Sequence, residues 1–135
     1  MEETIFTKII KGDIPSHKIY EDENTFAFLD IYPALPGHTL VIHKTAEQFV
    51  WDLDDTSYQE LMASAKKIAN HYRQVFDKNH ISLNIVGTDV PHNHVHLLPF
   101  NDSSELHISD RDRMAIEPDH AELAKLAEKL RLKND

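Results

Sequence analysis

The sequence predicts a single α+β domain with an antiparallel five-stranded sheet and one long helix. Segments with strand character come in two groups, three before residue 45 and two between residues 80 and 99. Between these groups, apolar residues recur at the helical spacing of three and four over residues 55–78. Strands that follow one another, with the helices set apart from them, are typical of the α+β class.

The N-terminal part is expected to contain a short helix and three strands. The helix covers residues 4–12, where Gly12 can end it. Its apolar residues fall on one side: Ile5, Phe6, Ile9 and Ile10. Strands are expected at residues 17–22 and 25–31, separated by a polar turn. A loop with two prolines leads to a largely apolar strand at residues 38–44, which we expect in the middle of the sheet.

The long helix at residues 55–78 and the elements after it complete the predicted domain. Candidate N-caps stand where the long helix begins: Asp54, Asp55 and Thr56. Strands follow at residues 80–87 and 90–99. Residues 101–117 are expected to be irregular and polar, and a final helix is expected at residues 117–132, with Pro118 near its start.

Length and composition limit the possible classes of protein. We expect one domain over residues 1–135, of which residues 101–135 form a C-terminal extension of loop and helix. The net charge of −9 argues against binding to polymeric nucleic acid, but it leaves room for a small phosphorylated ligand. The chain has no cysteine, so histidine and carboxylates are the only expected metal ligands. No leader or membrane segment is evident, so we expect a cytoplasmic protein without a membrane partner.

Three histidines alternate in the segment PHNHVHLLP, residues 91–99: His92, His94 and His96. In a strand, residues two apart lie about 6.6 Å from each other on the same face, so the three imidazoles would form a row. Such a row suits zinc binding with a further ligand from elsewhere. It also suits catalysis, because a neutral imidazole can attack phosphorus while its neighbours orient it. A polar face of a surface strand is the third interpretation.

Two segments of the chain resemble the histidine-triad (HIT) family, in its nucleotide-binding, HINT-like branch. They are HNHVHLLP and, at residues 5–42, IFTKIIKGDIPSHKIYEDENTFAFLDIYPALPGHTLVI. The resemblance covers nearly the whole chain. It implies the HIT-like fold, a symmetric homodimer, and hydrolysis or transfer of nucleoside monophosphates.

The resemblance also implies a role for individual residues. His94 matches the nucleophile that attacks the α-phosphorus, with His92, His96 and His38 as its helpers. Asp30 matches the acidic residue that binds the ribose hydroxyls, which suits a carboxylate because it accepts two hydrogen bonds. The positions around the base correspond to Ile5, Phe6, Ile9, Phe28 and Ile31. The positions near the phosphate correspond to Asn84, Gly87 and Asp89.

The chain also departs from the family pattern. Many bacterial members hold a structural zinc, and the corresponding positions here are Thr4, Thr7 and Ala46, so we expect no metal and no cofactor. Asp89 replaces a small hydroxyl residue and would repel a nearby phosphate. His43 replaces a proline, which we interpret as a surface change.

The sequence favours a nucleoside phosphoramidase that acts on an AMP-like purine nucleotide through a covalent His94 intermediate. A nucleotide-binding scaffold with little catalysis is one alternative, and a dinucleoside polyphosphate hydrolase is another. The hydrolase branch usually keeps a glutamine where this chain has Thr88. A metalloenzyme built on the histidines is the third alternative. Trp51 is expected to pack in the core or in a dimer interface.

Overall fold

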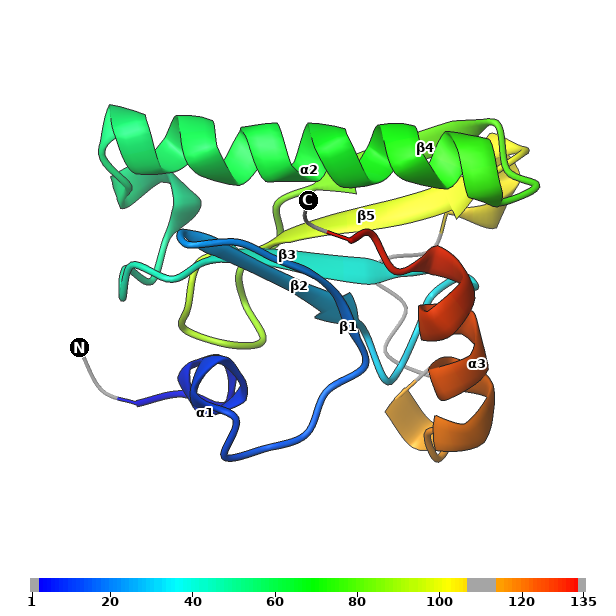
Figure 1. Ribbon diagram of the computed structural model, residues 1–135, viewed down its shortest axis with the longest axis horizontal. Helices are drawn as coiled ribbons and strands as arrows, with labels where there is room; N and C mark the ends of the chain where they lie inside the picture. The colour runs from blue at the N-terminus through cyan, green and yellow to red at the C-terminus, as the bar shows by residue number, and fades with distance from the viewer. Residues whose placement is uncertain (1–2, 107–113, 134–135) are drawn as a thin grey trace.

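The computed structural model describes residues 3–106 and 114–133 (Figure 1). Within these residues the helices are α1 (Ile5–Lys11), α2 (Asp55–Val75) and α3 (His120–Leu130). The strands are β1 (Lys18–Glu21), β2 (Thr25–Leu29), β3 (Thr39–His43), β4 (His80–Asn84) and β5 (Val95–Phe100). Residues 107–113, which belong to the predicted irregular segment, lie outside the described residues.

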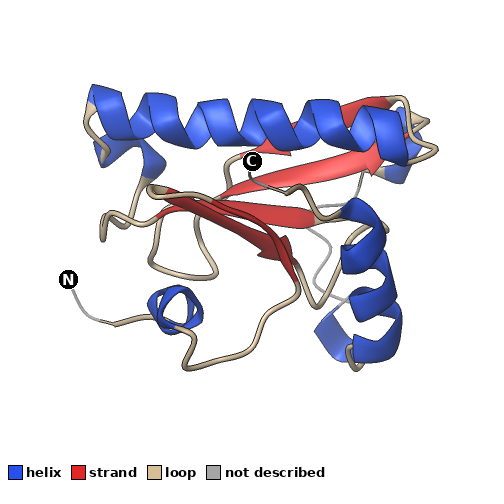
Figure 2. Cartoon of the chain, viewed as in Figure 1, coloured by secondary structure: helices blue, strands red, loops and turns tan. Residues whose placement is uncertain are grey.

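The five strands form one sheet in the order β1-β2-β3-β5-β4, and every neighbouring pair is antiparallel. Helix α2 lies along one face of this sheet, and α1 lies on the other side (Figure 2). The predicted α+β class with an antiparallel five-stranded sheet is therefore confirmed.

Alternating side chains of the strands serve the two faces of the sheet. Ala27 and Val41 belong to the core cluster beneath α2, whereas Phe28 and Leu40 belong to a smaller cluster with Phe6 and Ile9 of α1. This alternation follows from the period of two along a strand. In β5, Val95 and Leu97 belong to the core cluster beneath α2. His96, which lies between them, therefore faces the α1 side of the sheet.

Helix α2 carries the apolar stripe that the sequence predicts. Its buried residues include Leu61, Ala65, Ile68 and Tyr72, and the Asp54 side chain caps its N-terminus by accepting from the Ser57 amide at 2.7 Å. The Tyr72 hydroxyl lies 2.6 Å from the Thr39 hydroxyl, which ties α2 to the start of β3.

Helix α3 packs against β1, which is an edge strand of the sheet. Leu123, Ala127 and Leu130 are buried in the α2-side core. After the helix, the Leu132 amide donates to the Ile19 carbonyl at 2.9 Å. Within the described ranges, no helix is long and apolar enough to cross a membrane.

Two predicted strands begin later than the sequence suggests. β3 begins at Thr39, one residue after His38, and β5 begins at Val95 rather than at residue 90. His92 and His94 therefore precede the strand and only His96 lies in it, so the expectation of three histidines along one strand is wrong. The cause is the Asn93 side chain, which takes over hydrogen bonds that a strand would make with its main chain.

Candidate active site

A cavity of about 250 Å³ lies on the α1 side of the sheet and reaches the histidine segment. Its floor comes from β2 and the residues after it, its side from α1, and its end from residues 89–96. The predicted residues that line it are Ile5, Phe6, Ile9, Phe28, Asp30, Ile31, Asp89, His94 and His96. The fold thus brings nine of the predicted residues, from three separate segments, around one cavity.

The His94 imidazole is held in one tautomer by its own segment. Its Nδ1 lies 2.7 Å from the His92 carbonyl oxygen, which can only accept a hydrogen bond. The proton of the neutral ring therefore resides on Nδ1, and the lone pair on Nε2 is available. His94 is only 3% exposed.

Burial also decides the charge of His94. It lowers the pKa of His94, because the interior disfavours the imidazolium ion, while the carboxylates of Asp89 and Asp30 act in the opposite direction. Burial prevails, so the ring is neutral at pH 7. A neutral imidazole with a free Nε2 lone pair can act as a nucleophile.

His38 and His96 are joined by a hydrogen bond beside the cavity, and the proton positions on both rings are defined. The Ala34 amide donates to His38 Nδ1 at 3.0 Å, so the proton of a neutral His38 resides on Nε2. That Nε2 lies 2.9 Å from His96 Nδ1 and 3.6 Å from an oxygen of Asp30. His96 then accepts at Nδ1 and carries its own proton on Nε2, where it can donate to a substrate.

The same three residues have the composition of a metal site. Ligand atoms of Asp30, His38 and His96 lie within 4.8 Å of one another, the one such group in the described part of the chain. Two imidazoles and a carboxylate suit a divalent cation. However, a cation on His38 Nε2 would have to displace the proton that the Ala34 amide keeps there. The arrangement therefore favours a proton network over a metal ion.

Comparison with known proteins gives the family. The HIT domain matches residues 11–103. The chain belongs to the HIT family.

Its sequence relatives include the Protein hit of Bacillus subtilis, 43% identical over 105 residues, which cover 73% of this chain and 71% of that one. Another is the Adenosine 5'-monophosphoramidase HNT1 of Saccharomyces cerevisiae, 38% identical over 101 residues, which cover 73% and 63% of the two chains. The predicted family is therefore confirmed.

Solved structures of the family show the same fold. A Hit-like protein from Bartonella henselae has a TM-score of 0.77 at 30% identity, with 96% of this chain and 95% of that chain covered. A zinc-bound histidine triad family protein from Mycobacterium smegmatis also has a TM-score of 0.77 at 30% identity, with 94% and 89% covered.

The positions of the family zinc in this HIT chain do not fit a zinc ion. The Thr4 and Thr7 hydroxyls cap α1 reciprocally: Thr4 Oγ1 accepts from the Thr7 amide, and Thr7 Oγ1 accepts from the Thr4 amide at 2.7 Å. Ala46 offers no ligand atom. His92 Nδ1 is buried and has no hydrogen-bond partner among the described residues, but one imidazole cannot hold zinc alone. That this chain binds no metal stays a prediction.

Four of the predicted site residues do not line the cavity. His92 lies behind it, with its ring 6.2 Å from that of Phe6 and its Nε2 donating to the His43 carbonyl at 2.8 Å. His38 reaches the site through His96. Asn84 lies on β4, where its amide donates to the Ser82 hydroxyl, and Gly87 follows in the loop.

The cavity also contains residues that the sequence did not single out, among them Tyr32, Leu40, Val90 and Met114. Leu40 could have been found, because strand alternation places it on the face of Phe28. Met114 could not, because it approaches from a segment without regular spacing.

Two sequence interpretations need correction. His43 is 4% exposed, so its replacement of the family proline is not a surface change. Trp51 is 70% exposed, with its ring 6.4 Å from that of Tyr58, so it does not pack in the core of this chain. The dimer interface remains the packing role open to it.

Proposed function

We propose that this HIT protein cleaves a substituent from the α-phosphate of a purine nucleoside monophosphate, such as adenosine 5′-phosphoramidate. The observation that carries the proposal is the His94 tautomer, fixed by the His92 carbonyl at the end of an apolar cavity. Family membership supports nucleotide chemistry in general. The yeast relative named as an adenosine monophosphoramidase supports this substrate class.

The proposed reaction has two displacement steps. His94 Nε2 attacks the α-phosphorus and forms a P–N bond, while the bond to the leaving amine breaks and the amine takes up one proton. The His96 Nε2–H donates a hydrogen bond that helps the amine to leave. Water then attacks the phosphorus, the bond to His94 breaks, and one proton is released with the nucleotide. The two steps therefore balance.

The apolar cavity and Asp30 are proposed to hold the nucleoside. Phe6, Ile9 and Phe28 offer the apolar surface for the base. One oxygen of Asp30 accepts from the Tyr32 amide at 2.8 Å, which orients the carboxylate beside the cavity for the ribose hydroxyls.

The test is turnover of adenosine 5′-phosphoramidate with EDTA present. We expect the wild type to release AMP and His94→Ala to lose about 10³-fold or more in kcat, because the covalent step needs the imidazole. His80→Ala is the matched control, since His80 is exposed on β4 and does not line the cavity.

Each alternative has its own outcome in this test. A wild type that binds AMP without turnover would favour a scaffold, and activity that EDTA abolishes would favour a metalloenzyme. Preferred cleavage of a dinucleoside polyphosphate would favour that hydrolase instead.

The proposed homodimer and the cytoplasmic location stay predictions. β4 lies at the edge of the sheet, so one side of its main chain has no strand partner among the described residues. Light scattering of the purified chain would give the oligomeric state.

A further inference from the structure

Residue 43 connects three parts of the molecule through its four polar groups. Its amide donates to Asn93 Oδ1 at 2.9 Å, and its carbonyl accepts from His92 Nε2 at 2.8 Å. Its imidazole Nδ1 accepts from the Thr45 amide at 3.0 Å, and its Nε2 lies 3.0 Å from an oxygen of Glu60. Since Nδ1 accepts, the proton of a neutral His43 resides on Nε2 and donates to the Glu60 carboxylate.

Asn93 faces His43 where the ladder between β3 and β5 stops. The last pair in that ladder is Val41 with Val95, and the same register would place residue 43 opposite residue 93. Instead of a main-chain pair, the Asn93 side chain accepts from residue 43 and donates to the Thr45 and Glu47 carbonyls, each at 3.0 Å. Asn93 is 1% exposed, and these three bonds use both of its N–H donors and one lone pair of Oδ1.

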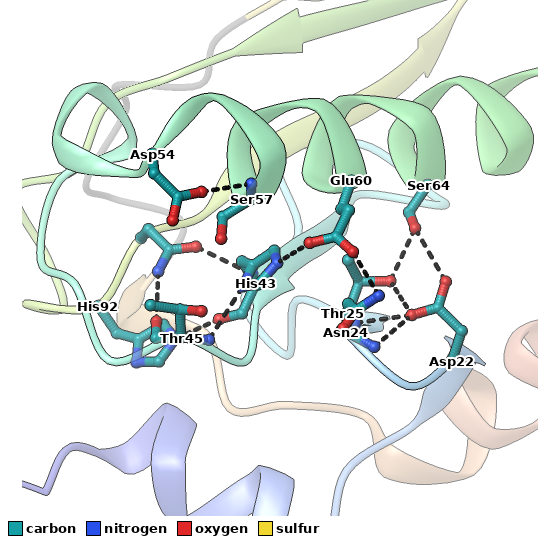
Figure 3. A network of polar contacts seen from close by, with 11 residues as sticks. Asp22, Asn24, Thr25, His43, Thr45, Asp54, Ser57, Glu60, Ser64 and His92 are labelled. Atoms are coloured by element: carbon teal, nitrogen blue, oxygen red, sulfur yellow. Dashed lines mark hydrogen bonds and ion pairs between the residues drawn. The ribbon is translucent and has the colours of Figure 1, made fainter.

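The contacts of His43 continue from helix α2 to the candidate nucleophile. Glu60, on α2, contacts His43 Nε2 with one carboxylate oxygen. Its other oxygen accepts from the side-chain amide of Asn24 (Figure 3). The His43 carbonyl holds the His92 ring, and the His92 carbonyl holds His94 Nδ1 at 2.7 Å. Three successive hydrogen bonds therefore lead from a helical side chain to the His94 ring.

We propose that Glu60, His43 and Asn93 are positioning residues for His94, a proposal that rests on the nucleophilic role given to His94 above. None of the three lines the cavity, so none touches the substrate. Their function is to hold residues 92–94 off the β3 ladder, with the His92 carbonyl aimed at His94 Nδ1. A proline at residue 43 could not make the bond to Asn93, because proline has no amide proton.

Variants of Glu60 provide the kinetic test. We expect Glu60→Ala to lower kcat about tenfold with KM nearly unchanged, since a small displacement of the nucleophile affects chemistry more than binding. Glu60→Gln should restore part of the activity, because its amide oxygen can still accept from His43, whereas its amide nitrogen can no longer accept from Asn24. The matched control is Ser64→Ala, one turn further along α2, where the Ser64 hydroxyl contacts Thr25 and Asp22 but no residue of the 92–94 segment (Figure 3).

The loss of kcat in each variant is compared with its loss in free energy of unfolding. If Ser64→Ala lowers kcat as much as Glu60→Ala at equal loss of stability, the network is merely structural and the proposal fails. It also fails if Glu60→Ala leaves kcat unchanged.

A spectroscopic test does not depend on turnover. The ¹⁵N shifts of His94 should show the proton on Nδ1 in the wild type and in Ser64→Ala. In Glu60→Ala and Asn93→Val they should move toward a mixture of the two tautomers. If Asn93→Val does not fold, Glu60→Ala still decides the question.

The two tests together separate this inference from the proposed function. A wild type without phosphoramidase activity would defeat the proposed function, whereas a tautomer that shifts in Glu60→Ala would still support the positioning link. An unchanged tautomer in Glu60→Ala would overturn the link, whatever the activity.

Discussion

At the scale of single residues, Asp89 is the acid that least fits a phosphate site. It lines the cavity together with His94 and makes no hydrogen bond or ion pair with the described residues. The other described residues that line this cavity include no lysine or arginine. Among the described residues, a bound phosphate would therefore face a carboxylate without a neutralising lysine or arginine, and the two negative charges would repel each other.

Replacing Asp89 should change both the pH profile and the binding of product. In Asp89→Asn the pKa of His94 should fall further, because a nearby negative charge that favours the imidazolium is removed. The acid limb of kcat/KM should move to lower pH, since that limb reports the free enzyme. AMP should bind a few times more tightly, by about tenfold at most, and less so at high salt. pH-rate profiles and AMP titrations at two salt concentrations would measure these effects.

Asp52→Asn is the control for charge alone, because Asp52 is exposed and does not line the cavity. A shift of the acid limb to higher pH in Asp89→Asn would contradict the prediction. An equal shift in Asp52→Asn would show that the net charge of the protein, rather than Asp89, is responsible.

At the scale of elements, the turn that precedes β3 depends on Gly37. Its φ is 89°, in the left-handed region, and a Cβ there would lie 3.0 Å from Pro99 Cγ and 3.1 Å from Phe76 Cε2. Gly87 has a similar φ of 78°, but a Cβ on it would meet no atom within 4 Å. The two glycines therefore separate backbone strain from close packing.

Gly87→Ala should lower the free energy of unfolding by about 1–2 kcal/mol, the cost of a left-handed residue with a side chain. Gly37→Ala should cost about 1–3 kcal/mol more, because β5 and the end of α2 must also move. Urea unfolding of the two variants beside the wild type measures the difference. Equal losses would mean that the Pro99 and Phe76 side chains yield without cost.

The elements also show what local sequence patterns can predict. The stripe on α2 and the apolar runs of β2 and β3 are local patterns, so the sheet and the long helix could be predicted. The start of β5 could not, because it depends on Asn93 bonding to residues 43–47, about fifty positions away. The burial of His43 has the same origin. Its partners Glu60 and His92 come from different elements, and no local pattern indicates them.

At the scale of the whole molecule, the histidines and the carboxylates of the cavity were predictable, and the hydrogen-bond network behind them was not. Family resemblance placed His94, His96 and Asp30 in one site, and the fold brings them together. Which ring nitrogen of His38, His96 and His94 carries the proton depends on the Ala34 amide and the His92 carbonyl. The positions of those two main-chain groups are set only when the loops and strands pack together in the folded chain.

Three histidines with a lowered pKa should also control how the stability of the whole molecule depends on pH. The pKa values of His17, His92 and His94 are all lowered in the folded protein, with burial as the largest cause. In the unfolded chain each would titrate near about 6.5. Below that pH the unfolded state binds more protons than the folded state, so stability is present above about 6.5 and is lost as the pH falls.

We therefore expect a lower urea midpoint at pH 5.5 than at pH 7.5, measured at one fixed protein concentration so that any association stays constant. Carboxylates with lowered pKa, such as Asp22, weaken stability only at still lower pH, so they do not account for this window. His92→Gln should flatten the dependence, because it removes one of the three groups while an amide can still donate to the His43 carbonyl. A midpoint that stays constant or rises on acidification would show that these imidazoles accept protons in the folded state without penalty. The neutral His94 on which the proposed chemistry depends would then lose its physical basis.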